Sequence, residues 1–258
     1  MVIGVWQLLA FPLNLAAMLI LLVFRVPLVG RFAAQCVHLV QEALSQLLNV
    51  GDLFLRAAGY RITKGLRLRL VVLRADGVPI VAQDALHRQI ETARQTFLAA
   101  GIVLDVGIQV DDRDAPPAVL DVGCNARAYW EDLWTTGRYF EAAAQRHAFH
   151  MAFVQLLGFG APLFAFVVRS MAGCSIGCSL GAAADYVTLE AKAVRALPFE
   201  ALDDPTLLAH EIGHALGLLH RRDRDNLLSP HSGRGISLTA WQITVIRGSR
   251  HTVFRTED

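Results

Sequence analysis

Three histidines and one glutamate within eleven residues carry most of the chemical information in this chain. They lie in the segment HEIGHALGLLH, residues 210–220, in which His210 and His214 are four positions apart. On an α-helix this spacing rotates the second side chain by about 40° and moves it about 6 Å along the axis, so both imidazoles can reach one divalent ion. Glu211 is the next residue round the helix, where its carboxylate can reach a water bound at that ion.

The residues after the second histidine supply a third ligand. Gly217 can adopt the left-handed backbone that ends a helix, so the chain can turn back and present His220 beside the first pair. Three imidazoles around zinc leave one coordination position open for water. Five fixed positions of this kind arise by chance on the order of once in ten thousand chains or fewer. The spacing therefore predicts one bound Zn²⁺ with His210, His214 and His220 as ligands.

The helix that carries these side chains has a recognisable beginning. Asp204 is a favourable N-cap residue, and Pro205 suits the first helical position. Five apolar residues of the same segment give the helix a face for the core; they are Ile212, Ala215, Leu216, Leu218 and Leu219. We therefore expect a helix that begins near Asp204, packs on the core and ends near Gly217.

The segment 210–220 resembles the HExxHxxGxxH signature of the metzincin clan of zinc endopeptidases, and its details are similar to those of the matrixin-type members. The resemblance covers roughly residues 66–247. It implies zinc ligation by His210, His214 and His220, with Glu211 as the general base. It also implies an active-site helix beneath a mixed sheet, with an antiparallel edge strand lining the cleft.

The chain departs from the clan in two places. Leu228, in the stretch 226–230, stands where the clan has the methionine of a turn under the zinc. Leu and Met have nearly equal volume and that methionine is a packing residue, so we expect a working site at a small cost in stability. No latency segment with a cysteine is visible, since Cys36 lies in an amphipathic stretch. Asp223 and His231 follow closely, and both are better interpreted as surface residues than as ligands.

The remaining sequence predicts an α/β (α+β) domain over residues 61–258, with a mixed, mostly parallel sheet over the active-site helix. Alternating residues predict strands at 66–73 and 102–110, and apolar residues at helical spacing predict a helix at 82–100 between them. This strand–helix–strand order makes the two strands parallel neighbours. We expect further strands at 162–168 and 186–190, mostly helical structure over 125–153, an exposed loop at 111–117 and a helix over about 237–247.

Residues 2–24 contain no charged side chain and are long enough to cross a bilayer as a helix. They predict a transmembrane anchor over residues 1–25, with a cleaved signal peptide and a buried helix as the alternatives. The expected location is therefore a membrane, reached through a single N-terminal helix. Arg25 and Arg31 favour a cytoplasmic catalytic domain, but two arginines leave its side of the membrane open.

Residues 26–60 form an amphipathic helix and linker. Five apolar residues recur at helical spacing, and polar residues take the other side; the apolar residues are Val37, Val40, Leu44, Leu47 and Leu48. This helix can lie on a membrane surface or pack on the domain, and its low positive charge argues against a specific lipid role.

The composition excludes two other classes of protein. Lys and Arg number 24 against 23 Asp and Glu, so no excess charge is present to bind nucleic acid. Four cysteines in 258 residues do not make a disulfide scaffold. Cys174 and Cys178 can form a local disulfide or remain free thiols, and without a nearby histidine they make a weak zinc site.

These observations predict a zinc-dependent endopeptidase that hydrolyses a protein or peptide substrate through a water activated by zinc and Glu211. The alternative is a catalytically silent, zinc-stabilised binding module held at a membrane. Glu211 argues against it, because a structural site is usually closed by a fourth ligand and has no use for a free carboxylate. A membrane protein with an accidental motif is the third and most remote hypothesis.

Overall fold

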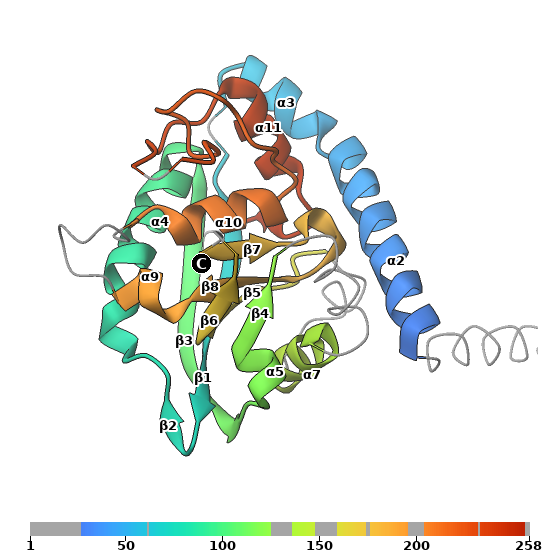
Figure 1. Ribbon diagram of the computed structural model, residues 1–258. Helices are drawn as coiled ribbons and strands as arrows, with labels where there is room; N and C mark the ends of the chain where they lie inside the picture. Colours follow the sequence, from blue (N-terminus) through green and yellow to red (C-terminus); the bar gives the residue numbers. More distant parts are fainter. Residues whose placement is uncertain are drawn as a thin grey trace, which may run out of the picture.

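The structure, a computed structural model, describes residues 27–60, 62–124, 136–147, 159–173, 176–195, 204–231 and 233–255. The expected anchor at 2–24 and most of the stretch 125–153 lie outside these residues. Within them a twisted mixed sheet forms the centre of the molecule, and helices surround it (Figure 1). The mixed α/β architecture expected from the sequence is confirmed.

Five strands build the body of the sheet in the order β3–β1–β5–β8–β7. β1 (Lys64–Ala75) lies parallel to both β3 (Ile102–Asp114) and β5 (Leu163–Val168), and β5 lies parallel to β8 (Tyr186–Glu190). β7 (Gly177–Ser179) pairs antiparallel with β8 at the edge. Two short strands, β2 (Val78–Pro79) and β9 (Thr252–Phe254), pair antiparallel with the two ends of β1.

The parallel pair β1–β3 follows from the chain between them. A 3₁₀ turn η1 (Gln83–Leu86) leads into helix α4 (His87–Ala99), which ends before Gly101. The backbone of Gly101 has φ +72°, a left-handed conformation that suits a residue without a Cβ. The crossover expected between residues 66 and 110 is thus confirmed.

The interior of the sheet is apolar on both sides. Every residue of β5 is buried, as the continuous apolar run predicts for a central parallel strand. Helix α7 (Gly137–His147) packs on this strand, since the ring centroid of Phe140 lies 4.8 Å from that of Phe166 and 5.2 Å from that of Tyr186. Aromatic contacts at these distances anchor α7 to β5 and β8.

Residues 111–117 differ from the expected exposed loop. β3 continues to Asp114, and the short helix α5 (Pro117–Leu120) follows. The extension is stabilised at Asp111, which is buried and accepts hydrogen bonds from Tyr139 at 2.9 Å and Arg146 at 3.1 Å. Both donors come from α7, so nothing in the local sequence indicated that this acidic stretch would be ordered as a strand.

A second, two-stranded sheet joins β4 (Asp121–Gly123) in parallel to β6 (Ser170–Ala172). The helices described after β6 in the chain are η3 (Gly181–Ala183), α9 (Ala191–Arg195), α10 (Leu207–Ala215) and α11 (Ala240–Gly248). α11 begins at the expected place, because Thr239 and Gln242 form a reciprocal capping box at its start.

The predicted amphipathic stretch forms two helices, α2 (Pro27–Leu48) and α3 (Val50–Ala57). They pack on the domain through their polar residues. Asp52 binds Arg247 through two hydrogen bonds of 2.8 and 2.6 Å, and Lys64 donates to Asn49 at 2.6 Å. Burial alone would raise the pKa of Asp52, but the hydrogen bonds and charge of Arg247 outweigh it and hold that pKa below its ordinary value.

The membrane location predicted from the sequence is corrected by the structure. Across the part of the chain that it describes, no helix combines the length and the apolar character needed to cross a bilayer. The segment 2–24, on which that prediction rested, lies outside the described residues.

Candidate metal centre

The start of helix α10 is fixed by two buried polar residues. Asp204 accepts hydrogen bonds from the backbone N–H and the hydroxyl of Thr206, at 3.0 and 2.6 Å. Gln89 of α4 donates to the carbonyl of Asp204 at 2.7 Å and accepts from the N–H of Leu208 at 3.0 Å. The N-cap position of α10 is therefore Thr206, two residues later than the expected Asp204, which instead holds the turn before the helix. Gln89 ties the same end to a distant helix.

The end of α10 is a glycine turn. The N–H of Gly217 donates to the carbonyl of His214 at 2.9 Å, and that of Leu218 donates to the carbonyl of Gly213 at 3.0 Å. This pair of bonds defines a Schellman motif, and Gly217 has the left-handed φ of +91° that the motif requires. The chain reverses there, as predicted, and returns His220 to the helix.

The three histidines meet at their Nε2 atoms. The Nε2 of His214 lies 3.1 Å from that of His210 and 3.0 Å from that of His220. Two imidazole nitrogens bound to one zinc ion in tetrahedral geometry lie about 3.3 Å apart. Within the described residues these three side chains are the only group of His, Cys, Asp or Glu whose ligand atoms gather in this way, so they could hold a metal ion.

The hydrogen bonds of the rings show why these nitrogens suit a cation. The Nδ1–H of His210 donates to the carbonyl of Leu227 at 2.7 Å, and the Nδ1–H of His214 donates to the carbonyl of Leu218 at 2.8 Å. A carbonyl can only accept, so in the neutral rings each Nε2 carries a lone pair instead of a proton. Two lone pairs 3.1 Å apart repel, and a shared metal ion removes that repulsion. The residues present therefore fit a divalent metal.

Protonation of the rings does not offer an alternative explanation. Burial, together with the nearby positive charge of Arg234, lowers the pKa of His210 to about 3. The same causes, burial first, lower the pKa values of His214 and His220. All three rings are thus neutral at ordinary pH, which is the form that binds metals.

Glu211 lies next to the cluster with its carboxylate over the cleft. Burial raises its pKa to about 8, although the charge of Arg234 acts in the opposite direction. In the described part of the chain no group donates a hydrogen bond to this carboxyl group. A cation held by the histidines would favour its ionised form, which is the form that accepts a proton. The backbone of Gly177 in β7 passes directly beside it: a Cβ at that position would lie 2.5 Å from the Glu211 Oε1.

A cleft of about 700 Å³ surrounds these residues. One wall is α10 with the turn to His220, and the other is the edge strand β7 with η3 behind it. The resemblance of residues 210–220 to the metzincin signature implied an antiparallel edge strand in this position. β7, which pairs antiparallel with β8, is a strand of this kind. The cleft thus places the half-buried strand β7 alongside the histidine cluster.

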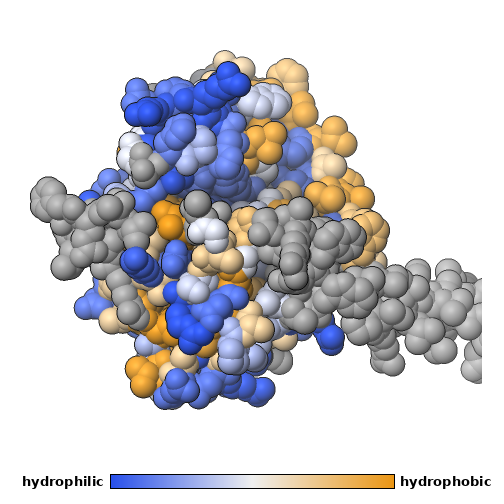
Figure 2. Space-filling model, viewed as in Figure 1, coloured by the Kyte–Doolittle hydropathy of each residue, from blue (hydrophilic) through white to orange (hydrophobic). Residues whose placement is uncertain are grey.

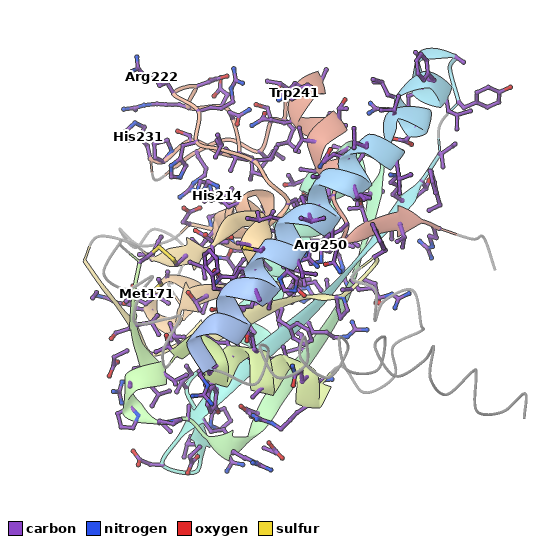
Figure 3. The ribbon with its side chains drawn as sticks, turned by 90° about the vertical axis from the view of Figure 1, so that its right-hand side faces the viewer. Met171, His214, Arg222, His231, Trp241 and Arg250 are labelled. Carbon is purple, nitrogen blue, oxygen red and sulfur yellow. A yellow bond between two sulfur atoms is a disulfide. The ribbon has the colours of Figure 1, made fainter. Side chains whose placement is uncertain are left out.

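A disulfide that was not predicted joins the wall of the cleft to the second sheet. Cys178 in β7 pairs with Cys124, the residue after β4, and not with Cys174. Figure 3 shows this bond in yellow near His214. The local pairing considered from the sequence is therefore wrong. The two cysteines are 54 positions apart, and no local signal connects them.

Arg234 is a second site residue that the sequence did not indicate. Its side chain is only 5% exposed, lines the cleft and donates to Asp204 at 2.7 Å. Asp204 thus joins the turn before α10 to the segment that follows the turn at 226–229. An isolated arginine in a polar stretch carries no sequence signal for such a position.

The turn at 226–229 lies beneath the histidines, as expected. Leu227 supplies the carbonyl that binds His210, and Leu228 is fully buried against Gly213 of α10. The turn is held by Asn226, whose side chain accepts from the N–H of Leu228 at 3.0 Å and pairs with Gln242 at 2.8 and 3.0 Å. Leu228 therefore occupies a packing position against α10.

Asp223 and His231 take no part in the cluster. Asp223 is exposed, and its carboxylate accepts a hydrogen bond from the N–H of Asp225 within its own turn. His231 is exposed on the loop that follows, labelled above His214 in Figure 3. Their interpretation as surface residues agrees with these positions.

Comparisons with known proteins give little further information. No protein-family model matches the sequence. No curated protein matches it either. Among solved structures, the chain is similar to the crystal structure of metalloproteinase-II from Bacteroides fragilis, with a TM-score of 0.43 and 14% identity over 74% of this chain. The match covers 54% of that protein, so this chain spans about half its length. The function proposed below therefore rests on the histidines and Glu211.

Proposed function

We propose that this chain is a zinc-dependent endopeptidase of metzincin type. The observation that carries the proposal is the arrangement of the ring nitrogens. His210 and His214 donate their Nδ1–H groups to carbonyls and point their Nε2 lone pairs at each other and at His220. Glu211 stands beside them, and the antiparallel edge strand and the turn at 226–229 have the places that the metzincin resemblance implies.

Each residue then has a defined role. His210, His214 and His220 would hold the zinc, and the carbonyls of Leu227 and Leu218 keep two of the rings in the metal-binding tautomer. When bound, zinc supplies an electrophile that polarises the scissile carbonyl and lowers the pKa of a water molecule. Glu211 would accept a proton from a water molecule in the cleft and deliver it to the leaving amine.

The edge strand would position the substrate. An extended peptide can add to an open strand edge through backbone hydrogen bonds, and its direction is then fixed beside the metal centre. β7 pairs with β8 on one side and lines the cleft with all three of its residues. In this mode of binding the main hydrogen bonds are made to the substrate backbone, so it suits a protein or peptide substrate.

The second candidate is a zinc-stabilised binding module without turnover. Glu211 distinguishes the two. A structural site has no need for a carboxylate that is buried, unpaired among the described residues and next to the ligands, whereas a hydrolase requires one.

The test compares the parent with Glu211→Gln, with Glu91→Gln on the exposed surface of α4 as the matched control. Zinc content is measured by mass spectrometry of the metal, and cleavage is followed on an unfolded protein substrate. We expect about one zinc per chain in all three proteins. Cleavage by Glu211→Gln should fall by about 10²- to 10⁴-fold or more, the contribution typical of a general base, and Glu91→Gln should match the parent.

Two outcomes would overturn the proposal. If the parent bound zinc but cleaved no substrate, and Glu211→Gln behaved in the same way, the result would favour the binding module. A parent protein that takes up no metal after reconstitution would show that the histidines are not a metal centre.

A further inference from the structure

Helices α2 and α3 bury polar side chains against the domain and expose apolar ones. From residue 32 onward, where burial is described, their buried residues are all polar, namely Gln35, Glu42, Asn49 and Asp52. Their exposed side chains are all apolar, apart from Cys36 and the hydroxyl of Tyr60 just after α3. A helix on the surface of a water-soluble domain normally has the opposite arrangement.

The exposed side of these helices is called here the α2–α3 face, residues 32–60. It holds twelve of the eighteen exposed large hydrophobic side chains of the described residues. Leu47 and Leu48 are 72% and 74% exposed, and Val40, Leu44 and Phe54 extend the face along both helices. Figure 2 shows this surface in orange at the right-hand margin, and in Figure 3 α2 crosses the front of the molecule.

The polar side of the helices cannot simply turn outward, because it is bound to the domain. Glu42 accepts hydrogen bonds of 3.0 Å from the hydroxyl of Ser249 and from the N–H of Arg250, and Gln46 donates to the carbonyl of Val245 at 2.9 Å. Gly248 lies so close to α2 that a Cβ there would collide with the Gln46 side chain. The apolar residues are therefore held on the outside by the polar contacts.

We propose that the α2–α3 face binds a second copy of this chain and forms a symmetric dimer. Twelve large side chains, each roughly half exposed, present on the order of 1,000 Å² of apolar surface, which exceeds the ~800 Å² per partner of a standard interface. Among residues 32–60 the one ionised side chain that is not buried is Arg56, near the end of α3, so little repulsion between like charges opposes the approach of two copies. A two-fold axis places the same patch on both partners, and homodimer interfaces are the most apolar class.

The charge of the helices favours a protein partner over a lipid surface. Helices that lie on membranes usually carry Lys and Arg beside their apolar face. Among residues 32–60 the side chains of this kind are Glu42, Asp52 and Arg56. Both carboxylates are turned into the domain, and the single, partly buried Arg56 does not form a row of basic residues beside the face. The dimer also leaves the metal centre accessible, because no residue of α2 or α3 lines the cleft.

The test measures the mass of the full chain in detergent-free buffer by light scattering after gel filtration and by sedimentation equilibrium. The double variant Leu47→Gln/Leu48→Gln removes the centre of the face, and both side chains are so exposed that folding of one copy should be unaffected. Leu98→Gln is the matched control, since Leu98 is 61% exposed on α4, outside the face. Circular dichroism and metal content check that all proteins are folded.

We expect a mass of twice 28.2 kDa for the parent and for Leu98→Gln. The dissociation constant of the double-variant dimer should be on the order of 100-fold higher than that of the parent, since two central interface side chains are lost. A monomeric parent would overturn the proposal, and so would a dimer that the double variant leaves unchanged. A monomeric parent that floats with phosphatidylcholine vesicles, while the double variant does not, would also overturn it and identify lipid as the occupant.

Discussion

The substitution Gly177→Ala tests how the edge strand controls Glu211. The new Cβ would lie 2.5 Å from the Glu211 Oε1 and 2.8 Å from its Cδ and Cγ, whereas ordinary contacts begin near 3.4 Å. The carboxylate must therefore move by roughly 1 Å. Glu211 cannot retreat with its helix, because both ends of α10 are fixed by the hydrogen bonds of Gln89 and of the turn at Gly217.

A displacement of this size has a predictable cost. Misplacing a catalytic group by about 1 Å reduces turnover by about 10²-fold, so kcat/KM for peptide cleavage by Gly177→Ala should fall by about that factor. Metal binding should be unchanged, since the three atoms nearest to the new Cβ all belong to Glu211. The assay combines steady-state cleavage of a fluorogenic peptide with metal analysis of the same preparation.

The control is Gly65→Ala in β1, where a Cβ meets no atom within 4 Å. This variant should cleave as the parent does. If Gly177→Ala were as active as the parent, β7 would not control the position of Glu211. If it lost its metal, the loss of activity would have a different cause, and the reasoning from the carboxylate would fail.

Three further predictions concern stability, each measured by urea denaturation. Cys178→Ser opens a disulfide that spans 54 positions, so it should lower the free energy of unfolding by about 4 kcal/mol, while Cys36→Ser at the exposed free thiol should change nothing. Asp52→Asn leaves the buried Arg247 without its counter-charge and should cost about 3 kcal/mol. Because Arg247 holds the pKa of Asp52 below its ordinary 3.8, this difference should persist at neutral pH and shrink as the pH falls below about 4; a difference that does not depend on pH would contradict the assigned charge pairing. Thr239→Ala removes one bond of the capping box and should cost about 1 kcal/mol, and no loss would show that the cap does not stabilise α11.

Local sequence patterns were sufficient to predict the central strands and the histidine cluster. β1, β3, β5 and β8 follow alternating or continuous apolar runs, and the β1–β3 crossover follows from their spacing. The convergence of the three histidines follows from helical geometry over eleven residues and one glycine. These features depend on neighbours close in the sequence, which is why the chain itself reveals them.

Features that depend on distant partners were not predictable. The Cys124–Cys178 bond and the order of residues 111–114 both require contacts across many positions of the chain. The period of α2 predicted a helix with two faces but not which face is buried. That choice depends on Arg247 and Lys64, because their buried charged groups bind Asp52 and Asn49 on the polar side of the helices. Apolar burial, the usual rule, was outweighed there by the cost of leaving those charges unpaired.

The link between Cys124 and Cys178 makes the finished protein depend on an oxidant as well as on its own folding. Residues 125–177, which include α7, β5 and β6, become a closed ring once the two sulfurs join, and β7 is the point of closure. The histidines and their helix lie outside this ring. Maturation can therefore separate into two events. The first is the assembly of the histidine cluster, and the second is the formation of the disulfide that fixes β7, the cleft wall facing the cluster.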